Sequence, residues 1–208
     1  MINILNTTLI IVDCVDSDRA HKALKECLKG CSFSDVKLLT SKDTDSPYRV
    51  KIDPIKSAHE YSEFMLRHVY EFCDTLHMQI VQYDGWIINP ETWHDDWAQY
   101  DYMGALFDID PFDDLSVGNG GFSFRSRRLM KFVSDHLGQR GSNGGYHGWH
   151  NEDGVITRGM RTMLTEAGFK FCPHRIAARY SLERCIRSMY HKPFGFHSFY
   201  ALKVLSEQ

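Results

Sequence analysis

The sequence predicts an α/β fold with a mainly parallel sheet, from three observations. The chain opens with an apolar run at Thr7–Val12, an amphipathic segment at Ser17–Leu28 and a second apolar run at Val36–Leu39, which is the order of a parallel strand–helix–strand unit. A longer amphipathic segment, Ser57–Leu76, is followed by another apolar strand at Met78–Gln82. The chain has 208 residues, 43% of them hydrophobic, which is enough for a full core.

The other elements follow from the same periodicities. Asp16 or Ser17 caps the first helix, whose apolar stripe contains Ala20, Leu24 and Cys27. No repeat or linker interrupts the chain, so we expect one domain over residues 1–208. Beyond residue 84 we expect extended chain at Trp86–Ile88, a helix at Ser126–Leu137, a loop at Gly138–Trp149, a helix at Asp153–Ala167 ended by Gly168, and a strand at Phe169–Cys172.

Charge and cysteine usage limit the class of protein. A formal net charge of -3 gives no overall attraction to nucleic acid or to an anionic membrane. The segment 91–114 is acidic and the segment 158–192 is basic, which indicates either two solvated faces or a basic surface that meets a phosphate-bearing ligand. The six cysteines form no C-x-x-C pair, and Leu9–Val12 is too short to span a bilayer. We therefore expect a reduced, cytoplasmic protein without a signal peptide or a membrane segment.

A glycine cluster in the run Val117–Ser126 is the strongest local signal. Gly118, Gly120 and Gly121 precede an alternating, strand-like pair of phenylalanines, and Asn119 brings the cluster its side-chain hydrogen-bonding group. Glycine is used where a ligand must approach the main chain closely, but Asn-Gly also occurs in turns between strands. Both interpretations stay open at this point.

Two acidic sites lie at the ends of predicted elements. Asp84 follows a strand and precedes a glycine, so it is either a ligand of a divalent metal or a ribose, or part of an Asp-Gly turn. Glu152 and Asp153 begin a helix, where carboxylates are favoured by the helix dipole and where one of them could act as a general base. The preceding loop could cover this site and stack on a ring through Tyr146, His147, Trp149 and His150.

His197 stands in the aromatic turn Phe194-Gly195-Phe196-His197. A neutral imidazole is a good ligand for Mn²⁺-type metals and a donor to phosphate. Most of the eleven histidines must have ordinary roles, but an aromatic turn would fix this ring.

In this order, these residues resemble the nucleotide-sugar-dependent glycosyltransferases of the GT-A fold. They are more closely similar to an uncharacterised glycosyltransferase family with a Gln-x-Asp-Gly motif, a glycine-rich motif and a late Phe-Gly-Phe-His. The resemblance covers nearly the whole chain, and Val117–Arg128 is its most specific part. The matching segments are 82–86, 89–93, 100–105, 117–128, 152–153 and 194–197.

The resemblance implies a Rossmann-like, three-layer α/β/α sandwich and a role for each matching residue. Asp84 is expected to contact a metal, Mn²⁺ or Mg²⁺, that bridges the donor diphosphate, and His197 to complete that site. Asp153, with Glu152 beside it, is the expected base of an inverting transfer. The donor-binding residues implied are Val12, Asp13, Cys14, Gln82, Tyr83, Asp84, Gly118, Asn119, Gly120 and Gly121, and the acceptor-binding residues are Tyr146, Trp149 and His150.

The chain departs from the family pattern at Gln82, which stands where the D-x-D element has its first aspartate. Metal dependence is therefore less secure, and diphosphate oxygens and water would have to complete the coordination of a cation. The alternatives are an inactive relative that binds a nucleotide or carbohydrate, or another nucleotide-using α/β enzyme, although no P-loop lysine is present. A uridine-diphosphate donor is the default expectation, for a hexosyl- or pentosyltransferase. The acceptor is a glycan, a protein, a small molecule or a hydroxylated base flipped out of DNA, and the oligomeric state stays open.

Overall fold

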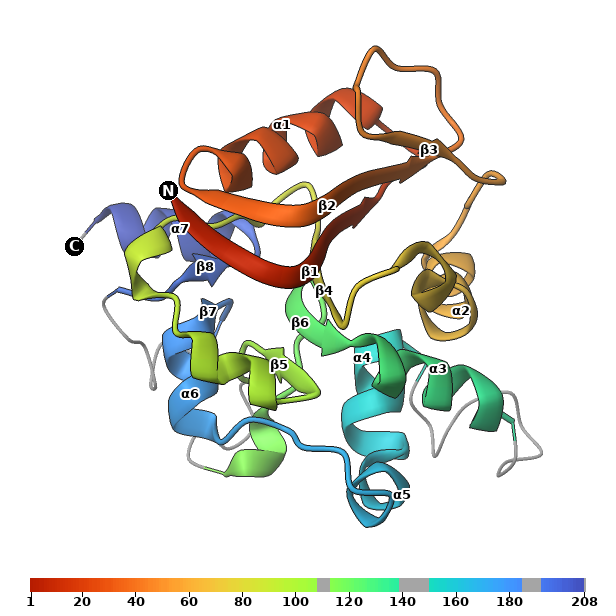
Figure 1. The fold of residues 1–208 in the computed structure, drawn as a ribbon, viewed down its shortest axis with the longest axis vertical. Coiled ribbons are helices and arrows are strands. Elements are labelled where there is room, and N and C mark those ends of the chain that lie inside the picture. Colours follow the sequence, from red (N-terminus) through yellow and green to blue (C-terminus); the bar gives the residue numbers. More distant parts are fainter. Residues whose placement is uncertain (108–112, 139–149, 185–191, 208) are drawn as a thin grey trace.

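The computed structural model describes residues 1–107, 113–138, 150–184 and 192–207. It confirms the α/β fold: a six-stranded sheet has the strand order β3-β2-β1-β4-β6-β5 (Figure 1). The strands are β1 (Ile2–Val12), β2 (Cys31–Thr40), β3 (Arg49–Lys51), β4 (His77–Val81), β5 (Tyr102–Gly104) and β6 (Phe122–Ser126). A second, two-stranded sheet pairs β7 (Ser181–Leu182) with β8 (Gly195–Phe196).

The sheet is parallel from β3 to β4 and reverses at β6. Strand β1 pairs in parallel with β2 and β4, whereas β6 is antiparallel to both β4 and β5. The start of β6 therefore lies at the edge of the sheet where β1 and β4 end. Because successive side chains of a strand point to opposite faces, Phe122 and Phe124 lie on one face of β6 and Ser123 and Arg125 on the other.

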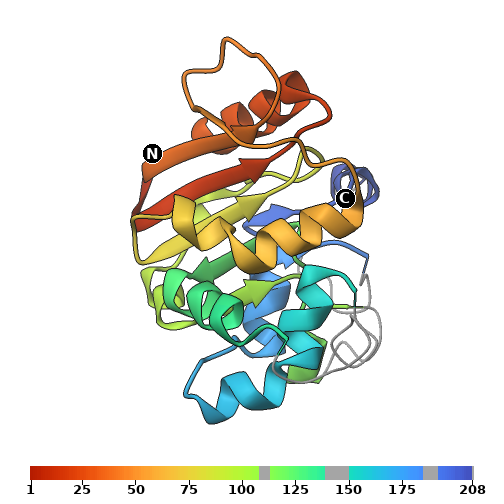
Figure 2. The same ribbon diagram turned by 90° about the vertical axis from the view of Figure 1, so that its right-hand side faces the viewer.

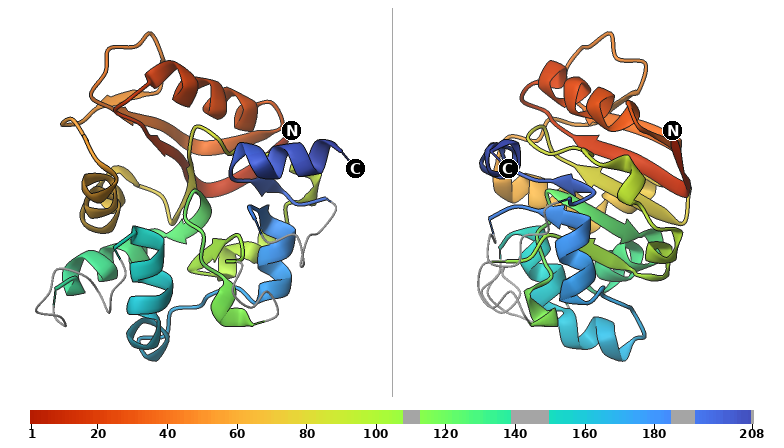
Figure 3. Two further views of the ribbon diagram at one scale, coloured as in Figure 1. Left: turned by 180° about the vertical axis from the view of Figure 1, so that it is seen from behind. Right: turned by 90° about the vertical axis from the view of Figure 1, so that its left-hand side faces the viewer.

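Helices complete a three-layer sandwich. Helices α2 (Ala58–Arg67) and α3 (Arg127–His136) lie side by side over one face of the sheet (Figure 2). Helix α6 (His174–Tyr180) lies with β7 and β8 on the other face (Figure 3). The remaining helices are α1 (Ser17–Leu28), α4 (Glu152–Gly154), α5 (Arg161–Glu166) and α7 (Phe199–Ser206), with 3₁₀ turns η1 (Val69–Phe72), η2 (Pro90–Thr92), η3 (Asp95–Gln99) and η4 (Asp114–Ser116).

Local signals explain where several elements begin. Asp16 caps α1 by accepting hydrogen bonds from the backbone amides of residues 18 and 19. Ser57 and Ser126 cap α2 and α3 in the same way. The aromatic side chains of β6 pack on the face of the sheet that carries α6. The centre of the Phe122 ring lies 5.3 Å from that of Tyr180 of α6 and 6.0 Å from that of Phe194.

Several predicted elements were wrong in extent, and β1 and β2 each begin five residues before the predicted start. The helix expected over 57–76 ends at Arg67, where His68 leaves the helical region with φ -127°, and continues as η1. The helix expected over 153–167 is divided by a π-helix, η5 (Val155–Gly159), in which the Met160 amide donates to the carbonyl of Val155. In place of the strand expected at 169–172, the structure has a single parallel bridge between Tyr102 and Phe171.

Other features were missed or confirmed. Strands β3, β5, β7 and β8 and helices α6 and α7 were not expected, since all are short. Gly168 follows α5 with φ +83°, the left-handed conformation that ends a helix. Within the ranges described, no helix has the length and apolar character needed to cross a membrane, and five cysteines are free thiols.

Candidate functional site

One edge of the sheet gathers the predicted site residues. The chain leaves β1 at Asp13 and β4 at Gln82, and it enters the antiparallel β6 from the glycine cluster. Ligands of open α/β sheets bind outside the carboxyl ends of the strands, which is the edge where these segments meet.

A cavity of about 400 Å³ opens at this edge, a size suited to a small organic ligand. Five of its lining residues were predicted as donor-binding: Val12, Asp13, Cys14, Gln82 and Tyr83. The sequence reasoning missed the others, which come from α1, from the chain before α2 and from α2 itself: Val15, Arg19, Ile55, Lys56, Ser57, Ala58 and Tyr61.

Asp13 shapes this cavity through contacts within the protein. Its Oδ1 accepts the backbone amides of Val15 (2.8 Å) and Asp16 (3.0 Å), and its Oδ2 accepts Arg19 Nε at 2.7 Å. The guanidinium of Arg19 in turn lies 3.8 Å above the centre of the Tyr83 ring. Asp13 therefore fixes Arg19 and Tyr83, and these two side chains form a charged, aromatic wall.

Asp84 and His197 meet, although 112 residues separate them in the sequence. His197 Nε2 lies 3.4 Å from Asp84 Oδ1 and donates to Gln82 Oε1 at 3.1 Å, while Nδ1 lies 3.4 Å from Glu183 Oε1. The backbone places the ring there, because the Ser198 amide donates to the carbonyl of Asp84. Gly85 permits this approach, since a Cβ at that position would lie 2.6 Å from the carbonyl oxygen of Phe196.

The Asp84 carboxylate and the His197 imidazole shift each other's ionisation. Burial disfavours the imidazolium of His197, but its contacts with Asp84 and Glu183 prevail and raise its pKa to about 9. Burial acts to raise the pKa of Asp84, yet contact with His197 leaves it below the usual value. The cluster thus holds a proton on His197 between two carboxylates.

The cluster fits a cation that is shared with a ligand. Asp84 Oδ1 is buried without a hydrogen-bond partner and faces His197 Nε2. Glu183 contacts the opposite ring nitrogen, and in the described part of the chain no three His, Cys, Asp or Glu side chains converge as a metal site. Asp84 and His197 would therefore supply only part of a coordination shell.

The glycine cluster packs against His197 and against the pair Glu152–Asp153. A Cβ on Gly121 would lie 2.2 Å from His197 Nε2, and one on Gly120 would lie 2.5 Å from Glu152 Oε1 and 3.0 Å from Asp153 Cβ. Its backbone is fixed by the Tyr102 hydroxyl, which donates to the carbonyl of Gly118 at 2.6 Å. The absence of side chains thus lets His197 and Asp153 approach the same turn.

Asn119 acts within this turn. Its Oδ1 accepts the amide of Gly121 at 3.1 Å, and the side chain is buried. Its observed contact is therefore with its own loop, as in an Asx turn.

Asp153 contacts Gly120, the neighbour of the glycine that lies against His197. Its Oδ2 accepts the Gly120 amide at 3.1 Å, and its Oδ1 accepts the amide of Gly154 at 2.7 Å. Burial, and then the charge of Glu152, raise the pKa of Asp153 to about 6. Glu152 is buried and pairs with Arg125, whose NH2 lies 3.2 Å from Glu152 Oε1.

Of the three predicted acceptor residues, the structure describes His150 alone. Tyr146 and Trp149 lie outside the described residues, and His150 is exposed.

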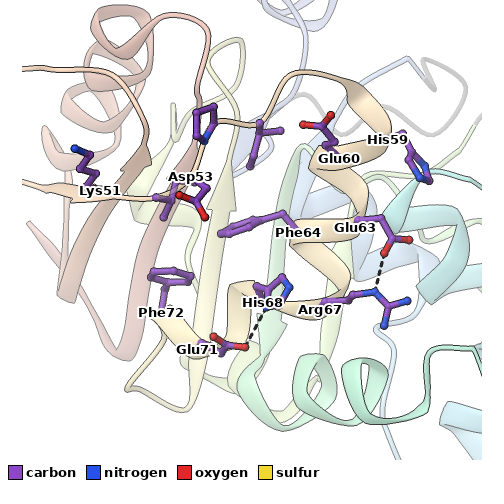
Figure 4. Close-up of a pocket in the computed structure, with 13 residues that line it drawn as sticks. Lys51, Asp53, His59, Glu60, Glu63, Phe64, Arg67, His68, Glu71 and Phe72 are labelled. Carbon is purple, nitrogen blue, oxygen red and sulfur yellow. Dashed lines mark hydrogen bonds and ion pairs between the residues drawn. The ribbon is translucent and has the colours of Figure 1, made fainter.

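A larger cavity lies elsewhere, on the outer side of α2 (Figure 4). It has a volume of about 890 Å³, and its wall includes the ion pairs Arg67–Glu63 (2.7 Å) and His68–Glu71 (3.2 Å). None of the predicted site residues lines it. Five predicted donor-binding residues line the smaller cavity and none lines this one, so the smaller cavity is the better candidate.

Four of the residues that escaped the sequence reasoning matter most for the site. Arg19 lies in the first turn of α1, and Tyr61 lies on the stripe of an amphipathic helix that is typical of ordinary core. Glu183 is one of two acidic residues in a basic segment, which was a usable signal. Arg125 alternates with phenylalanines in β6, and a charge in a buried strand was the signal for an internal partner.

Comparison with known proteins gives a family and a fold. A family model described as "Protein of unknown function (DUF5672)" matches residues 48–197. A glycosyltransferase involved in the glycosylation of the major capsid of PBCV-1 superposes with a TM-score of 0.57 at 9% identity, over 97% of this chain and 99% of that one. This likeness agrees with the GT-A type of fold.

A second solved structure is the mannosyltransferase PcManGT from Pyrobaculum calidifontis in complex with GDP-Man and Mn²⁺. It gives a TM-score of 0.49 at 12% identity, over 81% of this chain and 55% of that one, so the chain spans about half of its length. No curated protein matches the chain.

Proposed function

We propose, from the premise that the chain belongs to the DUF5672 family of proteins of unknown function, that it is a glycosyltransferase. It moves a sugar from a nucleotide-diphosphate sugar to a hydroxyl acceptor. One observation carries the proposal: Gly120 and Gly121 of a single turn contact Asp153 and His197, and His197 is hydrogen-bonded to Gln82, which lines the cavity of about 400 Å³. This arrangement offers separate places for a leaving diphosphate and for an attacking hydroxyl.

The nucleotide occupies the cavity between Asp13, Arg19 and Tyr83. The aromatic ring of Tyr83 is 37% exposed and can face a base, and Arg19 supplies positive charge beside it. We propose uridine diphosphate as the nucleotide. Gln82 and Tyr61 close the inner end of the cavity, since Gln82 Nε2 donates to the Tyr61 hydroxyl at 3.1 Å.

The leaving diphosphate lies at Asp84 and His197. A divalent cation, Mn²⁺ or Mg²⁺, would be held there by Asp84, and by His197 once its Nε2 proton is lost, and would neutralise the negative charge that develops on the diphosphate. Without the cation, the protonated His197 would instead donate a hydrogen bond from Nε2, which is 3.1 Å from Gln82 Oε1, to a phosphate oxygen.

Asp153 is the general base. With a pKa of about 6 it is largely ionised at pH 7 to 8, and it is basic enough to accept a proton from a hydroxyl as that oxygen attacks. The attacking oxygen forms a bond to the anomeric carbon, the bond from that carbon to the phosphate oxygen breaks, and the nucleoside diphosphate leaves with the electron pair. Direct attack on the face opposite the leaving group inverts the anomeric centre.

The acceptor is a hydroxyl of a glycan, a protein, a small molecule or a hydroxylated DNA base. The basic segment 158–192 is the feature that favours a DNA acceptor, but two of its arginines already stack on aromatic rings. Arg161 lies 3.6 Å above the Phe171 ring and Arg158 lies 5.4 Å from Phe107. Binding to duplex DNA that weakens steeply between 50 and 200 mM salt would support a nucleic-acid acceptor, and binding that is absent at low salt would remove it.

A donor panel tests the proposal. The purified chain is mixed with nucleotide-sugars that differ in base and sugar, with Mn²⁺, Mg²⁺ or a chelator, and the released nucleoside diphosphate is measured. We expect release with one donor class and none from the Asp153→Asn variant. Binding of a donor without release from any of them, with every acceptor class supplied, would instead favour an inactive nucleotide-binding relative.

A further inference from the structure

A buried ion pair lies beneath the glycine turn and joins it to the proposed base. Arg125 of β6 is fully buried, and its NH2 lies 3.2 Å from Oε1 of Glu152, whose side chain is 7% exposed. An arginine without exposure is rare in a strand core, because removing its charge from water is costly unless the pair is well hydrogen-bonded.

The guanidinium of Arg125 also holds the backbone of the turn. Its NH2 donates to the carbonyl of Gly120 at 3.2 Å, and its Nε donates to Ser123 Oγ at 2.9 Å. The Ser123 hydroxyl donates to the same carbonyl at 2.8 Å. Two donors therefore fix the carbonyl of Gly120, while the amide of Gly120 donates to Asp153.

This geometry leaves little freedom between the ion pair and the base. A Cβ on Gly120 would lie 2.7 Å from Arg125 NH2 and 2.5 Å from Glu152 Oε1. Glu152 precedes Asp153 in α4, so the ion pair fixes one residue of that turn and the Gly120 amide fixes the next. Arg125 thus contacts both segments that position the Asp153 carboxylate.

We propose that Arg125 is a positioning residue for glycosyl transfer, which aligns the Gly120 amide and the Asp153 carboxylate through its contacts with Gly120 and Glu152. This inference rests on the proposed function, in which Asp153 is the base. It goes beyond that function because Arg125 touches neither donor nor acceptor and is not part of the cavity wall.

The charged and titratable groups around Asp153 give the inference a specific signature. Glu152 raises the pKa of Asp153 and Arg125 lowers it. Tyr61 of α2 and Tyr102 of β5 also face this group, and burial raises the pKa of both hydroxyls, so they stay neutral near pH 7. Among the groups that act on the pKa of Asp153, only Arg125 and Glu152 are therefore charged near pH 7.

The experiment compares the acidic limb of the pH–rate profile in single and paired variants. We expect E152Q to move the limb to lower pH and R125Q to move it to higher pH, each by about one unit. We expect R125Q also to lower kcat about tenfold while leaving the KM for the donor unchanged. The double variant R125Q/E152Q, which removes both charges and keeps both shapes, should return the limb toward that of the unaltered chain.

The matched control is R128Q, three residues further along. Arg128 also pairs with a buried carboxylate, that of Asp101, but this pair lies at the opposite edge of the sheet, so its loss should not move the limb. If R125Q does not fold, R125K tests the same contact. It keeps the positive charge, so the acidic limb should stay where it is. It should nevertheless lower kcat, because a lysine cannot hold the Gly120 carbonyl and the Glu152 carboxylate together in one rigid geometry.

A measurement without substrate separates this inference from the proposed function. NMR titration of the Asp153 side-chain carboxyl carbon should show the same opposite shifts for E152Q and R125Q. If the pKa of Asp153 moves in the same direction in both variants, or in neither, the positioning role is overturned even if transfer is observed. Absence of transfer with opposite shifts present would overturn the proposed function and leave the structural link between Arg125 and Asp153 intact.

Discussion

Asp153 is held ionised in a place that does not favour ionisation. Burial and the neighbouring Glu152 raise its pKa to about 6, and two backbone amides partly compensate. A carboxyl group with a folded-state pKa above its unfolded value costs the folded protein stability once it is ionised. The contribution of Asp153 to stability is therefore greatest below the unfolded pKa near 4, falls as the pH rises to about 6, and stays lower above it.

Asp153→Asn tests both activity and stability at this residue. We expect transfer to fall at least about a hundredfold, because the base is lost, while donor binding is nearly unchanged. We also expect the variant to have the higher Tm above pH 7, with a difference that shrinks as the pH approaches 4. Calorimetric unfolding across this range provides the measurement, and an unchanged rate would show that Asp153 is not the base.

Asp84→Ala tests the leaving-group side. The Asp84 carboxylate is the oxygen ligand proposed for the cation, and its Oδ1 has no hydrogen-bond partner among the described residues. We expect the variant to lose the part of donor affinity that depends on Mn²⁺. Titration calorimetry with and without Mn²⁺ measures this, with Asp74→Ala, an exposed surface position, as the control. Equal Mn²⁺ dependence in both proteins would contradict the role of Asp84.

At the scale of elements, the reversed strand β6 determines the shape of the site. Its antiparallel direction brings the glycine turn to the edge where β1 and β4 end. The residues before β6 then contact His197 and Asp153, which arrive from two later segments. A parallel strand in this position would deliver Arg127 and the start of α3 to that edge instead.

Gly121→Ala tests this close packing. The new Cβ would lie 2.2 Å from His197 Nε2, so the ring must move away from Asp84. We expect donor affinity to fall about tenfold or more. The control is Gly168→Ala, which has φ +83° and open space around it, so it costs about 1 kcal/mol of stability without touching the site. Similar donor affinity in the two variants would mean that the His197 position is unimportant.

The sequence predicted the elements that have strong periodicity. The boundaries of α1 agree with the prediction, and the positions of β1, β4 and α3 were recognised because their apolar patterns are long. The short strands β3 and β5 and the π-helix were not recognisable, since each depends on contacts with distant residues. Sequence order brought Asp84, Asp153 and His197 forward as candidates, but the contacts of Arg125, Tyr61 and Glu183 depend on the tertiary fold.

At the scale of the whole molecule, the site joins segments from most of the chain. The cavity wall comes from β1, α1, α2 and the end of β4, while His197 comes from the turn after β8. A ligand that contacts these segments together should stabilise the entire fold. At 100 times its dissociation constant, a nucleoside diphosphate is expected to add about 2.7 kcal/mol to the free energy of unfolding.

Thermal unfolding with increasing nucleotide checks this expectation. Uridine diphosphate with Mn²⁺ should raise Tm progressively, and uridine with Mn²⁺ should have a much smaller effect. The Asp84→Ala variant should respond equally weakly to both. A rise of the same size with all nucleoside diphosphates would contradict the proposed preference for uridine.

The pairing of His197 with Asp84 also has a consequence for protein synthesis. The sheet core from β1 to β6 can form once residue 126 has left the ribosome, but the imidazole beside Asp84 arrives 71 residues later. We therefore expect a nascent chain that ends before His197 to contain only half of the Asp84–His197 contact. Under the proposed function, such a chain would not bind a metal-bound diphosphate, and the protein would become able to use a sugar donor only after translation has passed His197.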